Sequence, residues 1–453
     1  MKFIHSLLLL LFCSGLFAQD IHKENIDKIF DNALTNKEAY ENLRYLCEHA
    51  PGRLIGTPES IIAVEYMRDY MEAIGADTVF LQSFESPAWI CESASAKIMI
   101  NKQQIDLSVD ALGPSLSTDR FGLTAPVIEV FGIEEIKNMS EEEIKGKIVF
   151  YNRPVDPTVV NTFRGYGGAV DQRYWGPAEA AKKGAVGVIV RSVNSVIDDY
   201  PHTGSCNQKE YRIPAMAVST LDAELLSEKL KTEPNLQIHM NIQARDIEVT
   251  SYNLIADIRG SEKPDEYIVV GGHIDSWHNS AGAHDDGIGC MQSADVLRIF
   301  KELGINNKRS IRMILFMDEE LYQSGGRSYA EYTKTNNIKN YFALEADAGG
   351  MTPQGFTLDM PIEQVESVQL IHDYLKPYGI YYMVKGGSGV DIGPLKEFGV
   401  PLSGYRTDPQ RYFEYHHAAY DTFDKVNFRE MQLGSGNMAS LIYLIDAMDL
   451  LGK

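Results

Sequence analysis

Short apolar runs alternate with longer amphipathic stretches from Ser251 to the end of the chain. The apolar runs predict buried strands, and the amphipathic stretches predict helices. Strands are expected at 251–259, 266–272, 310–317, 341–346 and 401–406, and helices at 287–303, 324–334, 363–377 and 428–450. Alternation of this kind predicts an α/β fold: a mainly parallel, mixed sheet sandwiched by helices.

The first 250 residues have a different pattern. Helical periodicity occurs twice in residues 20–75, and strand-like runs follow in 78–110. Residues 113–246 then combine short β-like runs with long loops and one helix at 221–230. This pattern predicts a separate β-rich domain at 113–246, inserted between residues 19–112 and 247–453 of the main domain. It contains no cluster of His, Asp and Glu that would suggest chemistry of its own, and His202, which stands apart from other such residues, is expected to be a hydrogen-bonded structural or surface residue.

The N-terminus has the order of a secretory signal. Lys2 precedes an apolar run at 7–12, and then comes Ser14-Gly15-Leu16-Phe17-Ala18. This predicts a signal peptide at residues 1–18 and an exported protein, periplasmic or extracellular. No later stretch is long and apolar enough to span a bilayer.

The net charge limits the kinds of partner that we expect, and the positions of the cysteines limit the kinds of metal site. The formal net charge is −21 and the pI about 5.0, which argues against nucleic acid or an anionic membrane surface as a partner. Beyond Cys13, four cysteines remain, far apart and without a C-x-x-C pair: Cys47, Cys91, Cys206 and Cys290. A cysteine zinc site is therefore not expected. One disulfide or buried free thiols are both compatible with this spacing.

Acidic residues and histidines follow the predicted strands of the C-terminal half. The strand at 266–272 leads into His273-Ile274-Asp275, whose outer two side chains point the same way in strand geometry. Further groups follow the next elements: Asp285-Asp286, Asp318-Glu319-Glu320, Glu345 with Asp347, and His416-His417 with Asp421. Because carboxyl ends of parallel strands meet at one edge of a sheet, the sequence predicts a metal centre there.

Five motifs in this order resemble the co-catalytic dizinc exopeptidase family. They are GGHIDSW, HDDGIG, the Glu319-Glu320 pair, LEADAG and HHAAYDT. The similarity to the carboxypeptidase Q-like branch extends over most of the mature chain. In the middle block, EAAKKGAVGVIVRSV and PHTG resemble the protease-associated domain that this family often carries.

The resemblance implies two zinc ions per subunit and also implies which residues bind each ion. Asp285 would bridge the ions. His273 and Asp347 would complete one site, and Glu320 and His417 the other. His417 is chosen because the family's ligand lies four residues before the Asp of the Asp-Thr pair, which here is Asp421-Thr422.

The resemblance also implies catalytic roles. Glu319 would be the general base, Asp275 would hold the ring of His273, and His416 would donate to the developing oxyanion. A cis peptide bond is expected between Asp285 and Asp286. Two histidines depart from the family pattern, His278 and His284, and we expect both to be loop residues that tune access.

The function expected from this resemblance is that of a secreted zinc metallopeptidase. It would hydrolyse dipeptides or short peptides from a free end, as a dipeptidase or carboxypeptidase, with an aminopeptidase as the alternative. A receptor-like homologue without metals and a single-zinc glutaminyl cyclase share the fold, but the intact ligand set and the inserted domain favour a peptidase. Loops 152–176 and 200–214 are expected to approach substrate or a second subunit of a possible homodimer.

Overall fold

The structure is a computed structural model that describes residues 21–207 and 209–452. The signal peptide predicted at residues 1–18 lies outside the described residues. Among the helices of the described part, none is long and apolar enough to cross a membrane.

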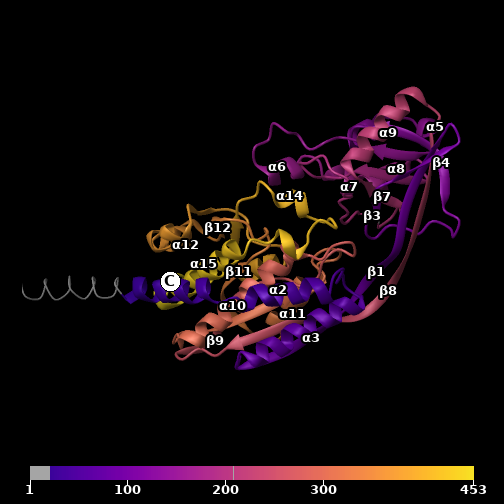
Figure 1. The fold of residues 1–453 in the computed structure, drawn as a ribbon. Coiled ribbons are helices and arrows are strands. Elements are labelled where there is room, and N and C mark those ends of the chain that lie inside the picture. Colours follow the sequence, from indigo (N-terminus) through magenta and orange to yellow (C-terminus); the bar gives the residue numbers. More distant parts are fainter. Residues whose placement is uncertain (1–20, 208, 453) are drawn as a thin grey trace, which may run out of the picture.

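Two long antiparallel strands connect the two parts of the molecule (Figure 1). β1 (Thr78–Ile100) pairs with β8 (Gln237–Ile258) along almost its whole length, with a bulge between Cys91 and Ser93. We call residues 92–246 the outer lobe, and residues 21–91 and 247–452 the body. The sequence predicts strand-like runs within 78–110 and a strand at 251–259, but not the earlier part of β8 at 237–250. The polar middle of the two strands stays extended because each strand supplies the other's backbone hydrogen bonds.

The body contains the predicted α/β sheet, in the order β13-β12-β14-β11-β9-β10-β8. Neighbours are parallel from β14 through β11 and β9 to β10, and β12 is parallel to β13, whereas β8 is antiparallel to β10 and β12 to β14. The strands are β9 (Lys263–His273), β10 (Arg309–Phe316), β11 (Lys339–Glu345), β12 (Pro353–Asp359), β13 (Tyr382–Lys385) and β14 (Leu402–Thr407). All five predicted strands are present, so the predicted fold class is confirmed. The sequence analysis missed β12 and β13, at the edge of the sheet.

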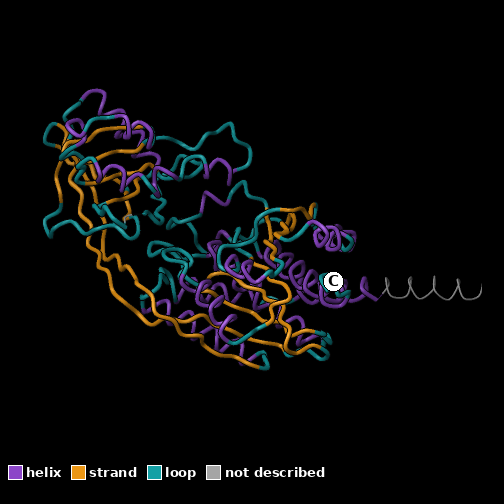
Figure 2. The backbone as a smooth tube through the Cα atoms, turned by 180° about the vertical axis from the view of Figure 1, so that it is seen from behind, coloured by secondary structure: helices purple, strands orange, loops and turns teal. Residues whose placement is uncertain are grey.

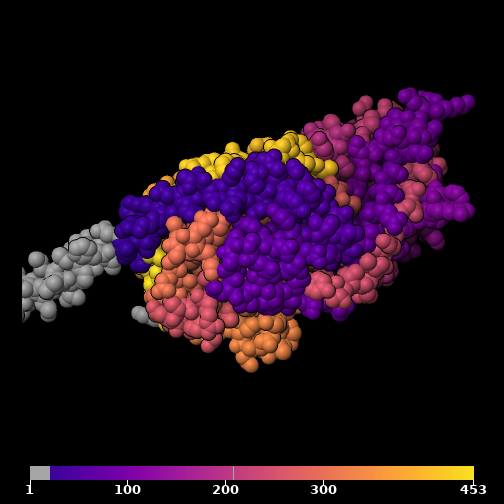
Figure 3. Space-filling model, turned by 60° about the horizontal axis from the view of Figure 1, so that its bottom comes forward, coloured from indigo at the N-terminus to yellow at the C-terminus, as the bar shows by residue number. Residues whose placement is uncertain are grey.

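Helices cover both faces of this sheet. One face packs against a layer of helices that includes the helix at 21–35, α2 (Glu38–His49), α3 (Pro58–Ala73), α10 (Ile288–Leu303), α12 (Ile362–Gln369) and α15 (Phe428–Ala447). The other face packs against α11 (Ser324–Thr335) and the 3-10 turn Gly393–Phe398. Figure 3 shows the N-terminal segment, in indigo and violet, spread over one side of the body.

Local signals explain where these helices begin and end. Thr57 caps α3 by accepting from the backbone N–H of Ser60, and Pro58 occupies the first helical position. The first predicted helical pattern is two helices, 21–35 and α2. The helix predicted at 363–377 is also divided, into α12 and α13 (His372–Leu375), and a 3-10 turn with Pro377 follows.

The outer lobe has its own parallel strands, in the order β4-β5-β6-β7, with β3 antiparallel at the end. Its strands are β2 (Gln103–Leu107), β3 (Val109–Ala111), β4 (Leu123–Val130), β5 (Ile148–Tyr151), β6 (Gly187–Arg191) and β7 (Ala215–Val218). Its helices are α4 (Ile133–Asn138), α5 (Glu141–Ile144), α6 (Thr162–Gly167), α7 (Asp171–Tyr174), α8 (Gly176–Lys182) and α9 (Thr220–Thr232). Seen from behind, helices lie beside its strands (Figure 2). β8 continues through residue 246 without a break, so no change of structure marks a domain boundary there. The domain boundaries predicted at 113 and 246 therefore stay a proposal.

Candidate metal centre

The ends of three neighbouring strands of the body bring acidic and imidazole side chains to one edge of the sheet. His273 is the last residue of β9, Asp318-Glu319-Glu320 follows β10, and Asp347 lies two residues beyond β11. The strands are parallel neighbours, so their carboxyl ends coincide. All of these side chains except Glu319 and Asp347 are buried, and those two are half-buried.

Asp285 lies between two groups of possible ligands. Its Oδ1 is 3.2 Å from His273 Nε2, which is also 3.7 Å from Asp347 Oδ1. Its Oδ2 is 3.5 Å from His417 Nε2 and 3.9 Å from His416 Nε2. Within each group, one ligand atom per residue lies within 4.8 Å of the others. One carboxylate therefore faces both groups with different oxygens.

Glu320 and His417 meet on the far side of Asp285. Glu320 Oε2 is 3.1 Å from His417 Nε2 and accepts a hydrogen bond of 2.6 Å from Trp277 Nε1. The backbone carbonyl of Thr203 lies 3.2 Å from His417 Nδ1. A carbonyl only accepts, so His417 Nδ1 carries the hydrogen, and its Nε2 presents a lone pair to two carboxylates.

Acceptors that face each other in this way fit a cation between them. Asp285 Oδ2 and Glu320 Oε1 are buried and have no hydrogen-bond partner. Buried acceptors without partners are costly, and a metal ion would satisfy them. Imidazole nitrogens and carboxylate oxygens are zinc's usual ligands besides thiolates. The donor set therefore fits the predicted metal.

Burial and like charges perturb the protonation of these groups. Burial, reinforced by neighbouring carboxylates, raises the pKa of Glu319 and of Glu320 well above the ordinary value, while His273 opposes this rise. Burial, reinforced by Arg173, lowers the pKa of His416 and of His417 well below 6.5. The two histidines are thus neutral, which is the form that binds metals.

Buried carboxylates around the centre hold its backbone in place. Asp275 accepts from the backbone N–H of Glu319 and Glu320, and its own carbonyl oxygen lies 3.2 Å from His273 Nδ1. Its carboxylate is farther from that nitrogen, at 3.6 Å. Asp275 therefore lies against the ring of His273 and also fixes the turn after β10, and its role in holding that ring stays a prediction.

The segment before α10 is shaped by two further acids. Asp421 accepts from the backbone N–H of His284 and Asp285 at 2.8 and 3.0 Å, and Asp286 accepts from that of His273 at 3.1 Å. Asp286 approaches β9 so closely that a side chain at Gly272 would collide with it. The peptide bond between Asp285 and Asp286 is cis, which confirms that prediction.

The outer lobe contacts the histidine pair through its loop at residues 202–203. Thr203 N–H donates to the carbonyl of His417 at 3.0 Å, and His202 Nδ1 donates to that of His416 at 2.7 Å. His202 is buried, so the prediction of a hydrogen-bonded structural histidine is confirmed. Arg173, on α7, donates to the Thr203 carbonyl and to Tyr166.

The two histidines that depart from the family pattern lie outside both groups. His278 pairs with Asp110 in the outer lobe at 2.8 Å. His284 stacks on Tyr415, and its Nδ1 accepts from the Gly350 N–H. The predicted site residues come together around Asp285, but these two do not join them.

Several residues around the centre gave no signal in the sequence. Arg173 is the clearest, because its contacts depend on which segments the fold brings together; Trp277 ends the GGHIDSW motif, but the sequence assigned it no role. Asp391 is another: it is buried, and neither of its carboxylate oxygens has a hydrogen-bond partner. Burial and nearby Glu345 and Glu319 raise its pKa well above the ordinary value.

A cavity of about 620 Å³ opens beside the centre. Asp285, Glu319, Glu320, Asp347, His416 and His417 line it from the body. From the outer lobe it is lined by Phe163, Tyr166, Arg173, Tyr174, Ser205 and Lys209. Both lobes therefore form its walls.

Known proteins resemble the chain in sequence and in fold. Residues 253–442 match peptidase family M28. Carboxypeptidase Q from Mus musculus is 30% identical over 434 residues, which cover 95% of this chain and 90% of that protein. The crystal structure of a peptidase M28 precursor from Shewanella amazonensis superposes with a TM-score of 0.90 at 29% identity, covering 94% of this chain and 97% of that one.

A more distant structure shares the fold alone. The zinc aminopeptidase BSAP from Bacillus subtilis has a TM-score of 0.69 at 21% identity, with coverage of 90% of this chain and 94% of that one. The identity to carboxypeptidase Q, over nearly the full length of both proteins, shows the family. The chain therefore belongs to peptidase family M28, as a carboxypeptidase Q-like metallopeptidase.

Proposed function

We propose that the protein is a dizinc exopeptidase that hydrolyses dipeptides and other short peptides from a free end. His273, Asp285 and Asp347 would hold one zinc ion, and Asp285, Glu320 and His417 the other. The observation that carries this proposal is the position of Asp285, whose two oxygens face separate ligand groups. Zinc bound there would supply a reactive water and polarise the scissile carbonyl.

Glu319 is the proposed general base. It follows the ligand-bearing strand, lines the cavity and is half-buried, while its neighbour Glu320 points to His417. Its carboxylate would take a proton from the attacking water and pass it to the leaving amine. A raised pKa suits this role, because a base works best when its pKa is near the working pH.

His416 is the proposed donor to the developing oxyanion. It lines the cavity and stacks on His417, with ring centroids 3.5 Å apart. The loop of the outer lobe holds its backbone carbonyl through His202. This contact would fix the ring's direction without occupying either of its nitrogens.

The charges of the side chains that line the cavity favour a short substrate with a free carboxylate. Three cationic side chains line it: Arg173, Lys209 and Arg327. Arg327 is exposed, and the structure gives it no hydrogen-bond or ion-pair partner among the described residues. A substrate carboxylate would satisfy its guanidinium. The relative named carboxypeptidase Q agrees with this preference, and an aminopeptidase is the alternative.

The outer lobe would act as the protease-associated domain of this enzyme. Residues from the loops 152–176 and 200–214 line the cavity, whereas the proposed ligands all come from the body. A lobe in this position would exclude long folded chains from the centre. The signal peptide expected at residues 1–18 would place the activity outside the cytoplasm.

A panel of matched peptides tests this proposal on a single purified sample. Dipeptides and longer peptides, each with a free, an amidated or an acetylated end, are assayed while zinc is measured on the same sample. We expect at least two zinc ions per chain and hydrolysis that requires a free carboxylate. Arg327→Met should raise KM for free-carboxylate peptides only. Hydrolysis that requires a free amine instead would favour the aminopeptidase, and efficient internal cleavage of an intact protein would exclude both.

A further inference from the structure

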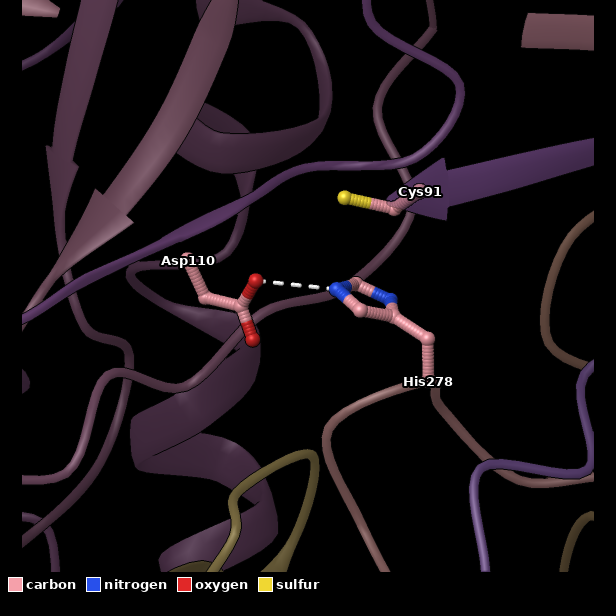
Figure 4. Close-up of side chains that lie close together, drawn as sticks. All are labelled: Cys91, Asp110 and His278. Atoms are coloured by element: carbon pink, nitrogen blue, oxygen red, sulfur yellow. Dashed lines mark hydrogen bonds and ion pairs between the residues drawn. The ribbon is translucent and has the colours of Figure 1, made fainter. Parts of the chain in front are cut away.

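A second cluster of metal-binding side chains lies where the body meets the outer lobe (Figure 4). It contains Cys91, Asp110 and His278, and one ligand atom from each lies within 4.8 Å of the others. Cys91 is at the bulge of β1, Asp110 is on β3, and His278 is in the loop after β9. Three segments far apart in the sequence thus supply one residue each.

The three side chains point toward one another in a largely buried space. His278 Nε2 is 2.8 Å from Asp110 Oδ1, and the exposed fractions of these side chains are 15% and 13%. Figure 4 shows the Cys91 thiol beside this pair. His278 Nδ1 is buried and has no hydrogen-bond partner. The rings of Trp89 and Trp277 pack edge-on against His278, at 5.6 and 6.1 Å between centroids.

Thiolate, imidazole and carboxylate are the three side-chain ligand types that zinc prefers. In a tetrahedral site with metal–ligand bonds of about 2.0–2.3 Å, ligand atoms lie roughly 3–4 Å apart. Here the His278 and Asp110 atoms lie 2.8 Å apart and all three ligand atoms lie within 4.8 Å of one another, so small side-chain shifts would give that spacing, and a water would complete the fourth position. The sequence spacing argued against a cysteine zinc site, because only the fold brings these residues together.

We propose that Cys91, Asp110 and His278 bind a divalent transition-metal ion, zinc foremost, at a site separate from the catalytic centre. Binding displaces the proton of the Cys91 thiol, and that of His278 where the ring is protonated, and both protons pass to solvent. The site joins the body, through Cys91 and His278, to Asp110 of the outer lobe.

A metal here would also steady the catalytic centre. His278 directly follows Trp277, whose Nε1 donates to Glu320. Fixing His278 restricts the loop that carries Trp277, and with it the orientation of a proposed zinc ligand. Among the described cysteines, Cys91 is the one that is not buried, so a metal ion would also protect an accessible thiol from oxidation.

The competing explanation is an ion pair without a metal. Burial lowers the pKa of His278, but Asp110 and Cys91 raise it more, to about 10. An imidazolium paired with Asp110 would hold the two lobes together by itself. This explanation predicts no thiolate–metal bond, so a probe of that bond decides between the two.

Cobalt substitution provides the probe. The full-length protein is stripped of metal and titrated with Co²⁺, and the near-ultraviolet thiolate-to-cobalt charge-transfer band is recorded. The proposed catalytic ligands include no cysteine, so the band reports on Cys91. We expect the band in the wild type, its loss in Cys91→Ser together with one metal equivalent per chain, and a weaker band in Asp110→Asn and His278→Gln.

Two control variants keep the result interpretable. Cys290→Ser removes the thiol whose Sγ lies 3.0 Å from the His273 carbonyl, and it should keep the band. Glu320→Gln should lose a catalytic metal but also keep the band, so failure of the proposed catalytic site would be seen separately. The proposal is overturned if the saturated wild type shows no thiolate band and Cys91→Ser binds as much metal, or if the band is lost in Cys290→Ser.

Discussion

The two lobes are built alike but differ at the ends of their parallel strands. In the body, β9, β10 and β11 lead into His273, Glu319-Glu320 and Asp347. In the outer lobe, β5 and β6 lead into Asn152 and Ser192. Both sets lie at carboxyl ends, where α/β proteins place their chemistry. Only the body has carboxylates there that face one another across a cavity.

The difference shows in how the polar groups are satisfied. In the outer lobe, Ser192 donates to the Val218 carbonyl at 2.7 Å, and Arg191 pairs with Glu224 at 2.8 Å. These groups are used within the lobe itself. In the body, Asp285 Oδ2 and Glu320 Oε1 are buried without a partner. The outer lobe also has buried polar atoms without a partner, such as those of the Asn194 amide, but those of the body are carboxylate oxygens beside imidazoles, a donor set that a metal ion would satisfy.

The largest expected effect comes from the paired glutamates of the body. Glu319→Gln keeps the shape of the side chain but cannot accept a proton, so turnover should fall by about 10²–10⁴-fold. Zinc content should stay unchanged, because the proposed ligands are intact. Substrate affinity should change much less, since the lost interaction acts in the transition state. Turnover and zinc content are measured on the same preparation.

Glu320→Gln is the matched variant. Its amide is a poorer zinc ligand than a carboxylate, so this variant should lose metal as well as activity. If instead Glu319→Gln loses zinc while Glu320→Gln retains it, the two roles are reversed. If neither variant affects turnover, the strand ends of the body are not the catalytic edge.

The next effect concerns His202, which links the two lobes, and the stability of the folded protein as the pH falls. Burial is the main cause that lowers the pKa of His202 from 6.5 to about 4. The unfolded chain therefore binds the proton first as the solution is acidified. This contribution to stability is complete above pH 6.5 and is lost as the pH falls toward 4. At about 1.4 kcal/mol per pKa unit, the loss is on the order of 3 kcal/mol.

The comparison with His202→Asn isolates this group from other acid-sensitive residues. An asparagine amide can still donate to the His416 carbonyl, but it does not titrate. Urea midpoints are measured between pH 4 and 7 for both proteins. The wild type should lose more stability than the variant over this range. Equal losses would mean that His202 is not held neutral in the fold.

Features that depend on neighbouring residues could be predicted from the sequence, whereas features that depend on residues far apart in the chain could not. The strands that carry His273 and Glu320 follow from apolar runs, and the motifs around them are contiguous, so both could be predicted. The middle of β8 is polar, and it is a strand only because β1 pairs with it. That pairing connects residues about 160 positions apart, and no local pattern indicates it.

The same reasoning applies to the site. The ligand candidates stand at the ends of predicted strands, where position along the chain implies position in space. Arg173 and Trp277 reach the centre only through the docking of one lobe on the other and the path of a loop. Asp391 is buried beside Glu345, although in the sequence it is one acid among many. Apart from Asp275, which the resemblance pointed to, the residues that orient the centre are therefore found in the structure and not in the sequence.

A smaller effect is expected when the outer lobe loses Arg173, one of the two cations that it contributes to the cavity. Arg173→Met removes hydrogen bonds to the Thr203 carbonyl and the Tyr166 hydroxyl. A charge-assisted bond contributes about 1.5–3 kcal/mol, so kcat/KM should fall roughly tenfold or more. Arg191→Met, which removes a buried arginine of the same lobe that pairs away from the cavity, is the control and should leave kcat/KM unchanged. Equal effects of the two substitutions would mean a general loss of stability.

The smallest effect tests whether the outer lobe's strand ends are structural only. Ser219 follows β7 and caps α9 by accepting from the Asp222 N–H at 3.1 Å. Ser219→Ala should lower the free energy of unfolding by about 1 kcal/mol, the usual contribution of such a cap. It should leave kcat/KM and zinc content unchanged, because Ser219 does not line the cavity. A shift in the denaturant midpoint without a change in turnover is the expected result. A clear loss of turnover in this variant would show that the strand ends of the outer lobe also act on the catalytic centre, and the contrast between the two lobes would fail.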